Sequence, residues 1–324
     1  MNNFMSIILT PEFFFSVIRI TSPILFATLG AVIVEKAGIS NIGLEGTMMI
    51  AALFGSLVAY WTSSWMIGLL TAILVGVLIS LLMSLFAFRL QTDVILVGVA
   101  INMIGSGGTL FFVKVFTKLS EGQAMASTTS LITSNLQIPT IQIPLLAEVP
   151  ILGPIFSGHS LLTYVAFLCV FLTWVLLYKT PLGLNLRSVG ENPNAAASVG
   201  VSVNRIRYIA MMLSGVMAGL GGAFLSMSYA MGWSQDMVAG RGFIALAAQS
   251  MGNGEPFGSF LATLLFGGAQ AFGIKLSAIG LDSNLASPIP YLITILGLVI
   301  FALKKRAAQK KHTPTIPSDS VICR

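Results

Sequence analysis

The chain has 324 residues, a mean hydropathy of +0.91 and 9% charged residues. Soluble domains usually carry about 25% charged residues, so this composition excludes an ordinary soluble protein and predicts an all-α, polytopic integral membrane protein. The formal charge of +6 does not indicate a nucleic-acid partner, because the excess of positive charge lies beside the apolar runs and in the tail.

The C-terminal tail is basic. Lysine and arginine cluster directly after the last apolar run, in the sequence KKRAAQKK at 304–311. Cytoplasmic segments of membrane proteins carry an excess of these residues. We therefore expect a transmembrane domain at 1–304 and a cytoplasmic tail at 305–324.

Neither the cysteines nor the histidines form a pattern typical of a bound metal or cofactor. Cys169 lies inside an apolar run and Cys323 lies in the tail, which gives no disulfide framework. His159 and His312 stand alone in polar segments, whereas a metal site needs several convergent ligands. The sequence therefore predicts no metal and no cofactor.

The first span is predicted at about 13–34, long enough to cross a hydrocarbon core of about 30 Å. No Lys or Arg precedes its apolar part, which is not typical of a signal peptide, and we expect the N-terminus outside. Arg19 lies near the outer end of the span. We expect it to snorkel or to cap a polar neighbour; a functional role is the alternative.

The next segment, EKAGISNIGLEG at 35–46, contains three glycines and two glutamates, too many for an ordinary lipid-facing helix. Irregular backbone at membrane depth is buried in protein or lines a wet cavity, and broken helices often form transport sites. Asn41 and Glu45 are therefore candidates for a translocation path. The alternative is an interfacial loop in which Asn41 caps the following helix.

Three further spans are predicted at about 44–61, 66–88 and 93–113. Asn102 lies within the third of these and either bonds a neighbouring helix or faces the path. Residues 114–160 are long, polar and poor in apolar periodicity, which predicts a folded extracytoplasmic loop.

A span at about 161–178 leads to a polar cytoplasmic loop at about 180–207. Asn192 and Pro193 predict a helix start, with Asn as the N-cap and Pro at the first helical position. Gly200 is suited to end this short helix. Such a helix either docks a partner or simply joins two spans.

The remaining spans are predicted at about 209–230, 257–274 and 288–303. The first of them carries Gly215 and Gly219 in a G-x-x-x-G pattern, with Gly222 beyond, which indicates close helix packing. The apolar run 243–251 is too short to span alone and predicts a half-helix or a short buried helix; its Gln249 is a further path candidate. The total is about nine crossings, within a range of eight to ten.

A weak internal echo links GLEG at 43–46 with GRG at 240–242, since each precedes an apolar helix rich in small residues. In the predicted topology the first lies on the inner side and the second on the outer side. This arrangement would suit two halves of inverted topology around a central path.

Several kinds of chemistry are absent from the sequence. No G-x-x-x-x-G-K-[ST] phosphate loop occurs, and neither does H-E-x-x-H or G-x-S-x-G. Glu45, Asp93 and Glu255 all fall at span ends, whereas a proton relay needs acids near the midplane. The sequence therefore predicts a non-enzymatic path that depends on an outside source of energy.

Four stretches in a fixed order resemble the permeases of the ribose, simple-sugar and nucleoside branch of ABC importers, the nucleoside subgroup most closely. They are GISNIGLEGTMMIAALFG at 38–55, TDVILVGVAINMIGSGGT at 92–109, LRSVGENPNAAASVGVSVNRIRYIAMMLSGVMAGLGGA at 186–223 and GRGFIALAAQSMGNGEPFGSFLATLLFG at 240–267. The resemblance covers most of the chain from about Ile33 to Phe272.

The resemblance implies a membrane subunit of the bacterial cell membrane that imports a small molecule, most directly a nucleoside. It identifies a coupling loop that seats in a separate ATPase, with the residues Gly190, Glu191, Asn192, Pro193, Asn194, Ala195 and Gly200. The other implied partners are a second, paralogous permease, membrane lipid and a substrate-binding lipoprotein that would contact residues 114–160. Alternatives are a permease for simple sugars or branched-chain amino acids, a secondary carrier, and a non-transport scaffold that holds an ATPase at the membrane.

Overall fold

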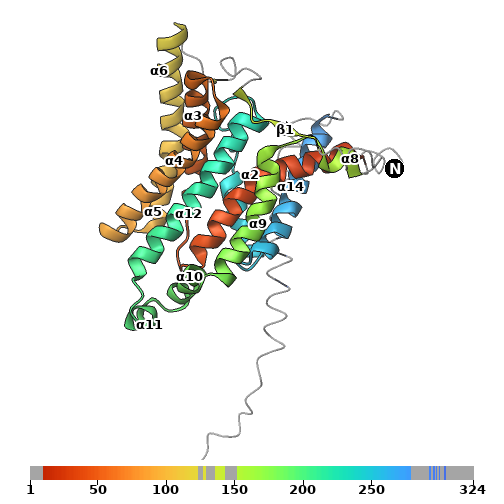
Figure 1. The fold of residues 1–324 in the computed structure, drawn as a ribbon. Coiled ribbons are helices and arrows are strands. Elements are labelled where there is room, and N and C mark those ends of the chain that lie inside the picture. The colour runs from red at the N-terminus through yellow and green to blue at the C-terminus, as the bar shows by residue number, and fades with distance from the viewer. Residues whose placement is uncertain are drawn as a thin grey trace, which may run out of the picture.

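The computed structural model describes residues 10–122, 127–128, 136–142 and 152–278, and the isolated residues 292, 295, 297, 299 and 303. Almost all regular structure in this part of the chain is helical (Figure 1). The expectation of an all-α, polytopic membrane protein is confirmed.

Within the described ranges, seven helical segments are long and apolar enough to cross a membrane. They are α2 (Pro11–Glu35), α3 (Leu44–Thr62), α4 with the π-helical turn η1 (Trp65–Ser84 and Leu85–Arg89), α5 and α6 joined by the π-helical turn η2 (Val94–Met103, Ile104–Gly108 and Thr109–Glu121), α9 (Leu161–Lys179), α12 with the π-helical turn η4 (Val203–Phe224 and Leu225–Tyr229) and α14 (Pro256–Ala278).

Shorter elements connect these helices. They are α8 (Leu152–Phe156), α10 (Pro181–Glu191), α11 (Pro193–Ser198), α13 (Arg241–Met251) and the strands β1 (Thr140–Ile141) and β2 (His159–Ser160). The two strands pair antiparallel, with Thr140 opposite Ser160.

The count of nine spans expected from the sequence is not reached within the described residues. The run at 243–251 belongs to α13, which has 11 residues and, at about 1.5 Å per residue, is too short to cross a membrane alone. The expected span at 288–303 lies largely outside the described residues.

Helices α2, α3 and α12 form the buried centre of the bundle. In the most apolar window of α2, 89% of the residues are buried, and the share is 72% in α3 and α12 but only 28% in α4 and in α5–α6. The helices of the second group therefore turn much of their apolar surface away from the protein.

Glycines allow the central helices to approach closely. An added Cβ would lie 2.5 Å from the Gly76 carbonyl oxygen at Gly215 and 2.6 Å from the Ala72 carbonyl oxygen at Gly219, so both glycines press α12 against α4. At Gly222 it would lie 3.0 Å from the backbone nitrogen of Ala52 in α3. The sequence predicts close helix packing at these same three glycines.

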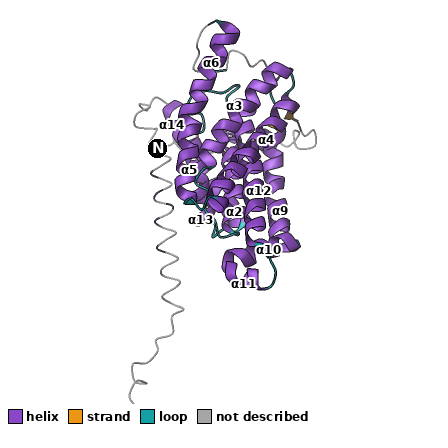
Figure 2. Ribbon diagram, turned by 90° about the vertical axis from the view of Figure 1, so that its left-hand side faces the viewer, coloured by secondary structure: helices purple, strands orange, loops and turns teal. Residues whose placement is uncertain are grey.

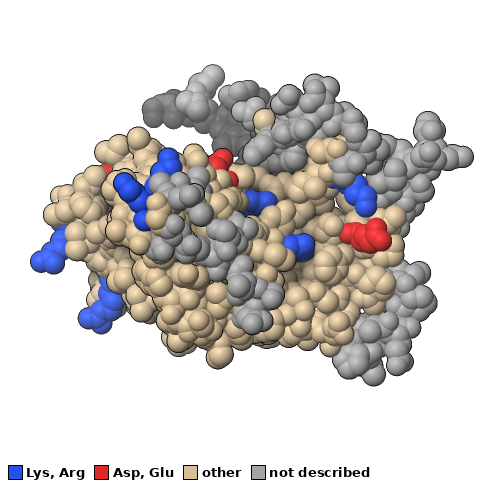
Figure 3. All heavy atoms as spheres, turned by 90° about the horizontal axis from the view of Figure 1, so that it is seen from above, with Lys and Arg blue, Asp and Glu red and all other residues tan. Residues whose placement is uncertain are grey.

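The two ends of the bundle differ. Helices α10 and α11 lie at one end, and α6 and β1 lie at the opposite end (Figures 1 and 2). Seen from the end with α6 and β1, the described surface is mostly uncharged, with scattered charged side chains (Figure 3).

The predicted start of the long loop at Lys114 is wrong, because α6 continues to Glu121. In this last part of α6, Val113 and Thr117 are buried while Lys114 is exposed. A lysine on the exposed face of an amphipathic helix does not end it, so the first lysine after an apolar run was a poor boundary marker.

The end of the predicted coupling loop at 207 is also too late. Helix α12 begins at Val203, and the buried side chain of Ile206 already belongs to its packed face. Arg205 and Arg207 are therefore part of the first turns of α12.

Candidate functional site

The segment that the sequence predicts as a coupling loop, at about 180–207, contains two consecutive helices, and we keep the name coupling loop for it. Thr180 accepts a hydrogen bond from the Gly183 N–H (3.1 Å) and begins α10, and Asn192 accepts from the N–H groups of Asn194 and Ala195 (3.1 Å each) and begins α11. The predicted N-cap at Asn192 and the Pro at the first turn are confirmed. Helix α10 was missed, although Thr180 before Pro181 is a typical start signal.

Helix α11 ends where the sequence predicts. Val199 follows its last residue, and Gly200 adopts φ +88°, a conformation that strongly favours glycine. Glu191, Asn192, Asn194 and Ala195 are exposed. Val199 exposes 78% of its surface, which places an apolar side chain in solvent at the tip of the loop.

The coupling loop contacts the turn between α2 and α3, residues 36–43, which we call the inner turn. Gly190, near the end of α10, has no room for a side chain: an added Cβ would overlap the Lys36 carbonyl oxygen and lie 3.2 Å from the Gly38 nitrogen. Gly38 itself has φ +73°. The two backbones are therefore in direct contact, so the coupling loop could not move toward the inner turn without displacing it.

A polar cavity of about 340 Å³ opens beside this contact. It is lined by residues of the α2 end, of α10 and of the α13–α14 turn, namely Glu35, Lys36, Arg187, Gly190, Glu191, Asn253 and Gly254. Three segments far apart in sequence thus meet next to the coupling loop.

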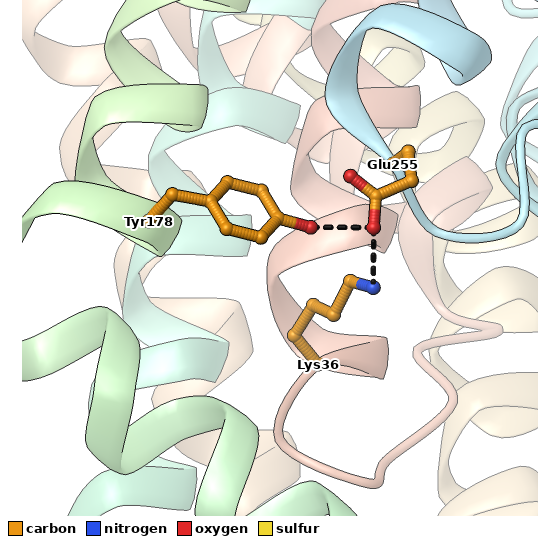
Figure 4. A network of polar contacts seen from close by, with 3 residues as sticks. All are labelled: Lys36, Tyr178 and Glu255. Carbon is orange, nitrogen blue, oxygen red and sulfur yellow. Dashed lines mark hydrogen bonds and ion pairs between the residues drawn. The ribbon is translucent and has the colours of Figure 1, made fainter.

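A three-residue network joins two of these segments, the α2 end and the α13–α14 turn, to α9 (Figure 4). The Tyr178 hydroxyl donates to the Glu255 carboxylate at 2.5 Å, and the Lys36 ammonium lies 3.3 Å from the same oxygen. Arg187 lies over the Tyr178 ring at 4.9 Å from its centroid. The network ties the ends of α2 and α9 to the α13–α14 turn. The sequence analysis did not identify these residues, because no local pattern joins positions so far apart.

Inside the bundle, two asparagines hold the inner turn and the start of α3. Asn41 is buried, donates to the Ser214 hydroxyl at 3.0 Å and accepts from the Gly43 N–H at 3.1 Å. Asn102 accepts from the Gly46 N–H at 2.8 Å and donates to the Ile42 carbonyl at 3.0 Å. Both side chains therefore bond backbone of the segment in which the sequence predicts an irregular helix start.

Glu45 binds the start of α13. Its two carboxylate oxygens accept hydrogen bonds from the backbone N–H of Gly240 at 2.7 Å and of Gly242 at 2.6 Å. The sequence analysis expects GLEG and GRG on opposite sides of the membrane. The structure brings the two stretches into contact inside the bundle, and Arg241 at the start of α13 still lies over the Tyr229 ring, 5.4 Å from its centroid.

The fourth path candidate, Gln249, lies on α13 and is buried. Its Nε2 has no hydrogen-bond partner among the described residues. Buried amide donors are normally paired, so this group is chemically distinct from the bonded side chains of Asn41, Glu45 and Asn102.

A separate cavity of about 200 Å³ lies at the α6–β1 end and shares no lining residue with the first. Arg19 reaches it and donates to the Tyr229 carbonyl at 2.9 Å, which confirms the expectation that it caps a polar neighbour. The His159 ring stacks on Phe15 with 4.0 Å between centroids, and burial lowers the pKa of this histidine.

No group of three or more His, Cys, Asp or Glu side chains that could hold a metal ion occurs in the part of the chain that the structure describes. Cys169 is a buried free thiol. His312 and Cys323 lie outside the described residues.

The structure is that of a helical membrane protein with a partly exposed loop in backbone contact with the turn between α2 and α3. Comparison with known proteins agrees with a membrane protein. Residues 13–303 match the family described as "Branched-chain amino acid transport system / permease component". The chain belongs to this family. The resemblance to ABC permeases is thereby confirmed.

Named relatives are similar over almost their whole length. A nucleoside ABC transporter permease protein, NupC of Lactococcus lactis, is 36% identical, with 90% of this chain and 92% of the relative covered. The guanosine ABC transporter permease protein NupQ of Bacillus subtilis is 36% identical, with 91% and 93% covered. A putative glucose ABC transporter permease protein, TsgC13 of Haloferax volcanii, is 29% identical, with 84% and 80% covered. No solved structure matches this permease.

Proposed function

We propose that this permease forms the membrane path of an ATP-driven importer of nucleosides in the bacterial cell membrane. The observation that carries the proposal is the 36% identity, over about nine-tenths of both chains, with two permeases named for nucleosides and guanosine. The paucity of charged side chains suits an uncharged substrate. The relative named for glucose keeps a simple-sugar substrate as the alternative.

The energy source in this proposal is a separate ATPase that binds the coupling loop. The support is structural: residues 191–200 are mostly exposed, Val199 and Leu184 expose 78% and 60% of their surfaces, and Gly190 is in close backbone contact with the inner turn.

The remaining partners are a second permease, which we take to be a paralogue, and a substrate-binding lipoprotein outside. In α4 and in α5–α6, only 28% of the residues in the most apolar window are buried. The apolar faces of these helices therefore offer surface to the second permease and to lipid. Strand β1, which belongs to the 114–160 segment, lies at the end opposite the coupling loop, where a binding protein would deliver substrate.

Nine crossings with the N-terminus outside and the C-terminus in the cytoplasm remain the topology that we propose. Helix α12 starts beside the coupling loop and ends at η4, and Glu255 again contacts Lys36. Residues 230–255 thus return through the protein as a loop followed by α13. Adding this crossing and one at 288–303 to the seven long helices gives nine.

Among the path candidates, Gln249 is the one that we propose contacts substrate, because its buried Nε2 is unpaired within the described residues. Asn41, Glu45 and Asn102 use their polar groups on hydrogen bonds inside the protein, so they shape the path around it.

Uptake of labelled uridine, guanosine and ribose by cells with and without this chain, all with the ATPase present, tests the proposal. Loss of nucleoside uptake alone supports it. Loss of ribose uptake alone would replace nucleosides by simple sugars, and uptake that stops when the ion gradient is collapsed would favour a secondary carrier.

A further inference from the structure

Helix α13 is held at both ends by side chains outside it. At its N-terminus, the first N–H groups of a helix have no partner within the helix itself, and here two such groups at Gly240 and Gly242 donate to one carboxylate, that of Glu45. Both hydrogen bonds are short, at 2.6 and 2.7 Å, and together they use both oxygens of the carboxyl group.

The start of α13 and the first turn of α3 are closely packed. An added Cβ at Gly242 would lie 2.6 Å from the Glu45 nitrogen and 2.7 Å from its Cα. The start of α13 therefore rests directly on the first turn of α3, and the two hydrogen bonds fix its direction as well as its distance.

At the other end of α13, the turn into α14 is held by Glu255, which pairs with Lys36 and Tyr178. Gly254 in the same turn lies against Lys36 as well, since an added Cβ would be 3.5 Å from its Cε. Figure 4 shows Lys36 and Tyr178 pointing at the Glu255 carboxylate from two different helices.

The two attachments of α13 lie on the same piece of chain. Lys36 is the first residue of the inner turn, and Glu45 lies just beyond the end of that turn, in the first turn of α3. Asn41 and Asn102 brace the segment between them, so it can move as one unit. The inner turn also contacts Gly190 of the coupling loop, through Lys36 and Gly38.

We propose that the inner turn carries motion of the coupling loop to α13, and that Glu45 is the positioning residue that makes α13 follow. Glu45 thus acts through the backbone of α13 and does not contact substrate. Because α13 carries Gln249, its displacement changes what the path presents to substrate. This inference rests on the proposed function, in which an ATPase drives the coupling loop.

The test uses the whole complex, purified from host membranes through a tag on this chain and reconstituted in liposomes. Glu45→Gln keeps the size of the side chain but replaces one acceptor oxygen by a donor, so one α13 amide loses its partner. Glu45→Asp keeps both acceptors on a shorter stem. Glu12→Gln makes the same chemical change at an exposed position of α2 and is the matched control.

We expect Glu45→Gln to keep the ATPase bound and hydrolysing ATP while uptake of uridine and guanosine per ATP falls about tenfold, within the range typical of coupling between sites. Glu45→Asp should restore part of the loss, and Glu12→Gln should match the unmodified chain. Normal uptake per ATP in Glu45→Gln would overturn the proposal. If Glu45→Gln does not assemble, Glu45→Asp decides: unchanged uptake per ATP would then refute it.

A distance measurement separates positioning from simple loss of structure and needs no transported substrate. Spin labels at Phe243 on α13 and Met212 on α12, both partly exposed, report the shift of α13 when ATP is trapped with vanadate. The chain would carry serine at Cys169 and Cys323. We expect the ATP-dependent shift in the unmodified chain and its loss in Glu45→Gln. A shift that persists in the variant refutes the inference, even if the substrate proves not to be a nucleoside.

Discussion

The inner turn and the coupling loop touch at Gly38 and Gly190, yet they are built in opposite ways. Residues 191–200 of the coupling loop are mostly exposed, and the helices α10 and α11 are capped by the residues that precede them, Thr180 and Asn192. The inner turn and the start of α3 are held by residues 56 to 173 positions away, since Asn102 and Ser214 bond this segment. The difference fits our proposals that one segment engages a partner and that the other transmits what the partner does.

If this contrast is correct, changes in the coupling loop should affect partner binding and leave folding intact, whereas changes around the inner turn should affect folding or coupling and leave docking intact.

The largest effect is expected from replacing Glu191–Ala195 with glycine and serine. This change removes the Asn192 cap and the first turn of α11 from an exposed segment. We expect co-purifying ATPase to fall about tenfold or more, a loss of at least about 1.4 kcal/mol of binding free energy, with normal insertion and thermal stability. ATPase at normal stoichiometry in the purified complex would contradict the docking assignment.

Gly46→Ala should have the next largest effect, and on folding. A Cβ there would overlap the Ile101 carbonyl oxygen and lie 2.7 Å from the Asn102 Cα. Forcing an extra carbon into close packing typically costs about 1–3 kcal/mol. The matched control is Gly107→Ala in η2, where nothing lies within 4 Å of the added carbon. Equal melting temperatures of the two variants in detergent would argue against the packed contact.

Asn102→Leu should destabilise the start of α3, because the Gly46 N–H and the Ile42 carbonyl both lose their partner. Leaving a buried group unpaired costs about 1–3 kcal/mol. We expect a lower melting temperature, reduced uptake and an unchanged amount of bound ATPase. Unchanged uptake together with unchanged melting would show that these two hydrogen bonds hold nothing that transport needs.

The same contrast explains how much of the structure could be predicted from the sequence. Asn192, Pro193 and Gly200 are local signals, and the helix between them lies where they predict it. The long apolar runs fix most spans in the same way. Gly215, Gly219 and Gly222 lie in close helix contacts because a G-x-x-x-G pattern also depends on one helix only.

The contacts at the inner turn could not be predicted in this way. The sequence singles out GLEG and GRG as related stretches, but nothing local shows that the Glu45 carboxylate binds the start of α13. No local pattern links Lys36, Tyr178 and Glu255 to one another, and only the folded arrangement of α2, α9 and the α13–α14 turn brings them together.

The smallest effect is expected from Lys36→Met, which removes the ion pair at the far end of α13 and keeps the length of the side chain. The Lys36 and Glu255 side chains are 21% and 49% exposed, and exposed ion pairs contribute only about 0–1 kcal/mol. We expect a small fall in melting temperature at low salt that nearly disappears at about 1 M salt, where the screening length is about 3 Å. Because Tyr178 still donates to Glu255, the turn keeps one of its two attachments. Coupling should therefore stay close to that of the unmodified chain, in contrast to Glu45→Gln. A loss of uptake per ATP as large as that of Glu45→Gln would mean that the exposed end of α13, and not its start, carries the motion.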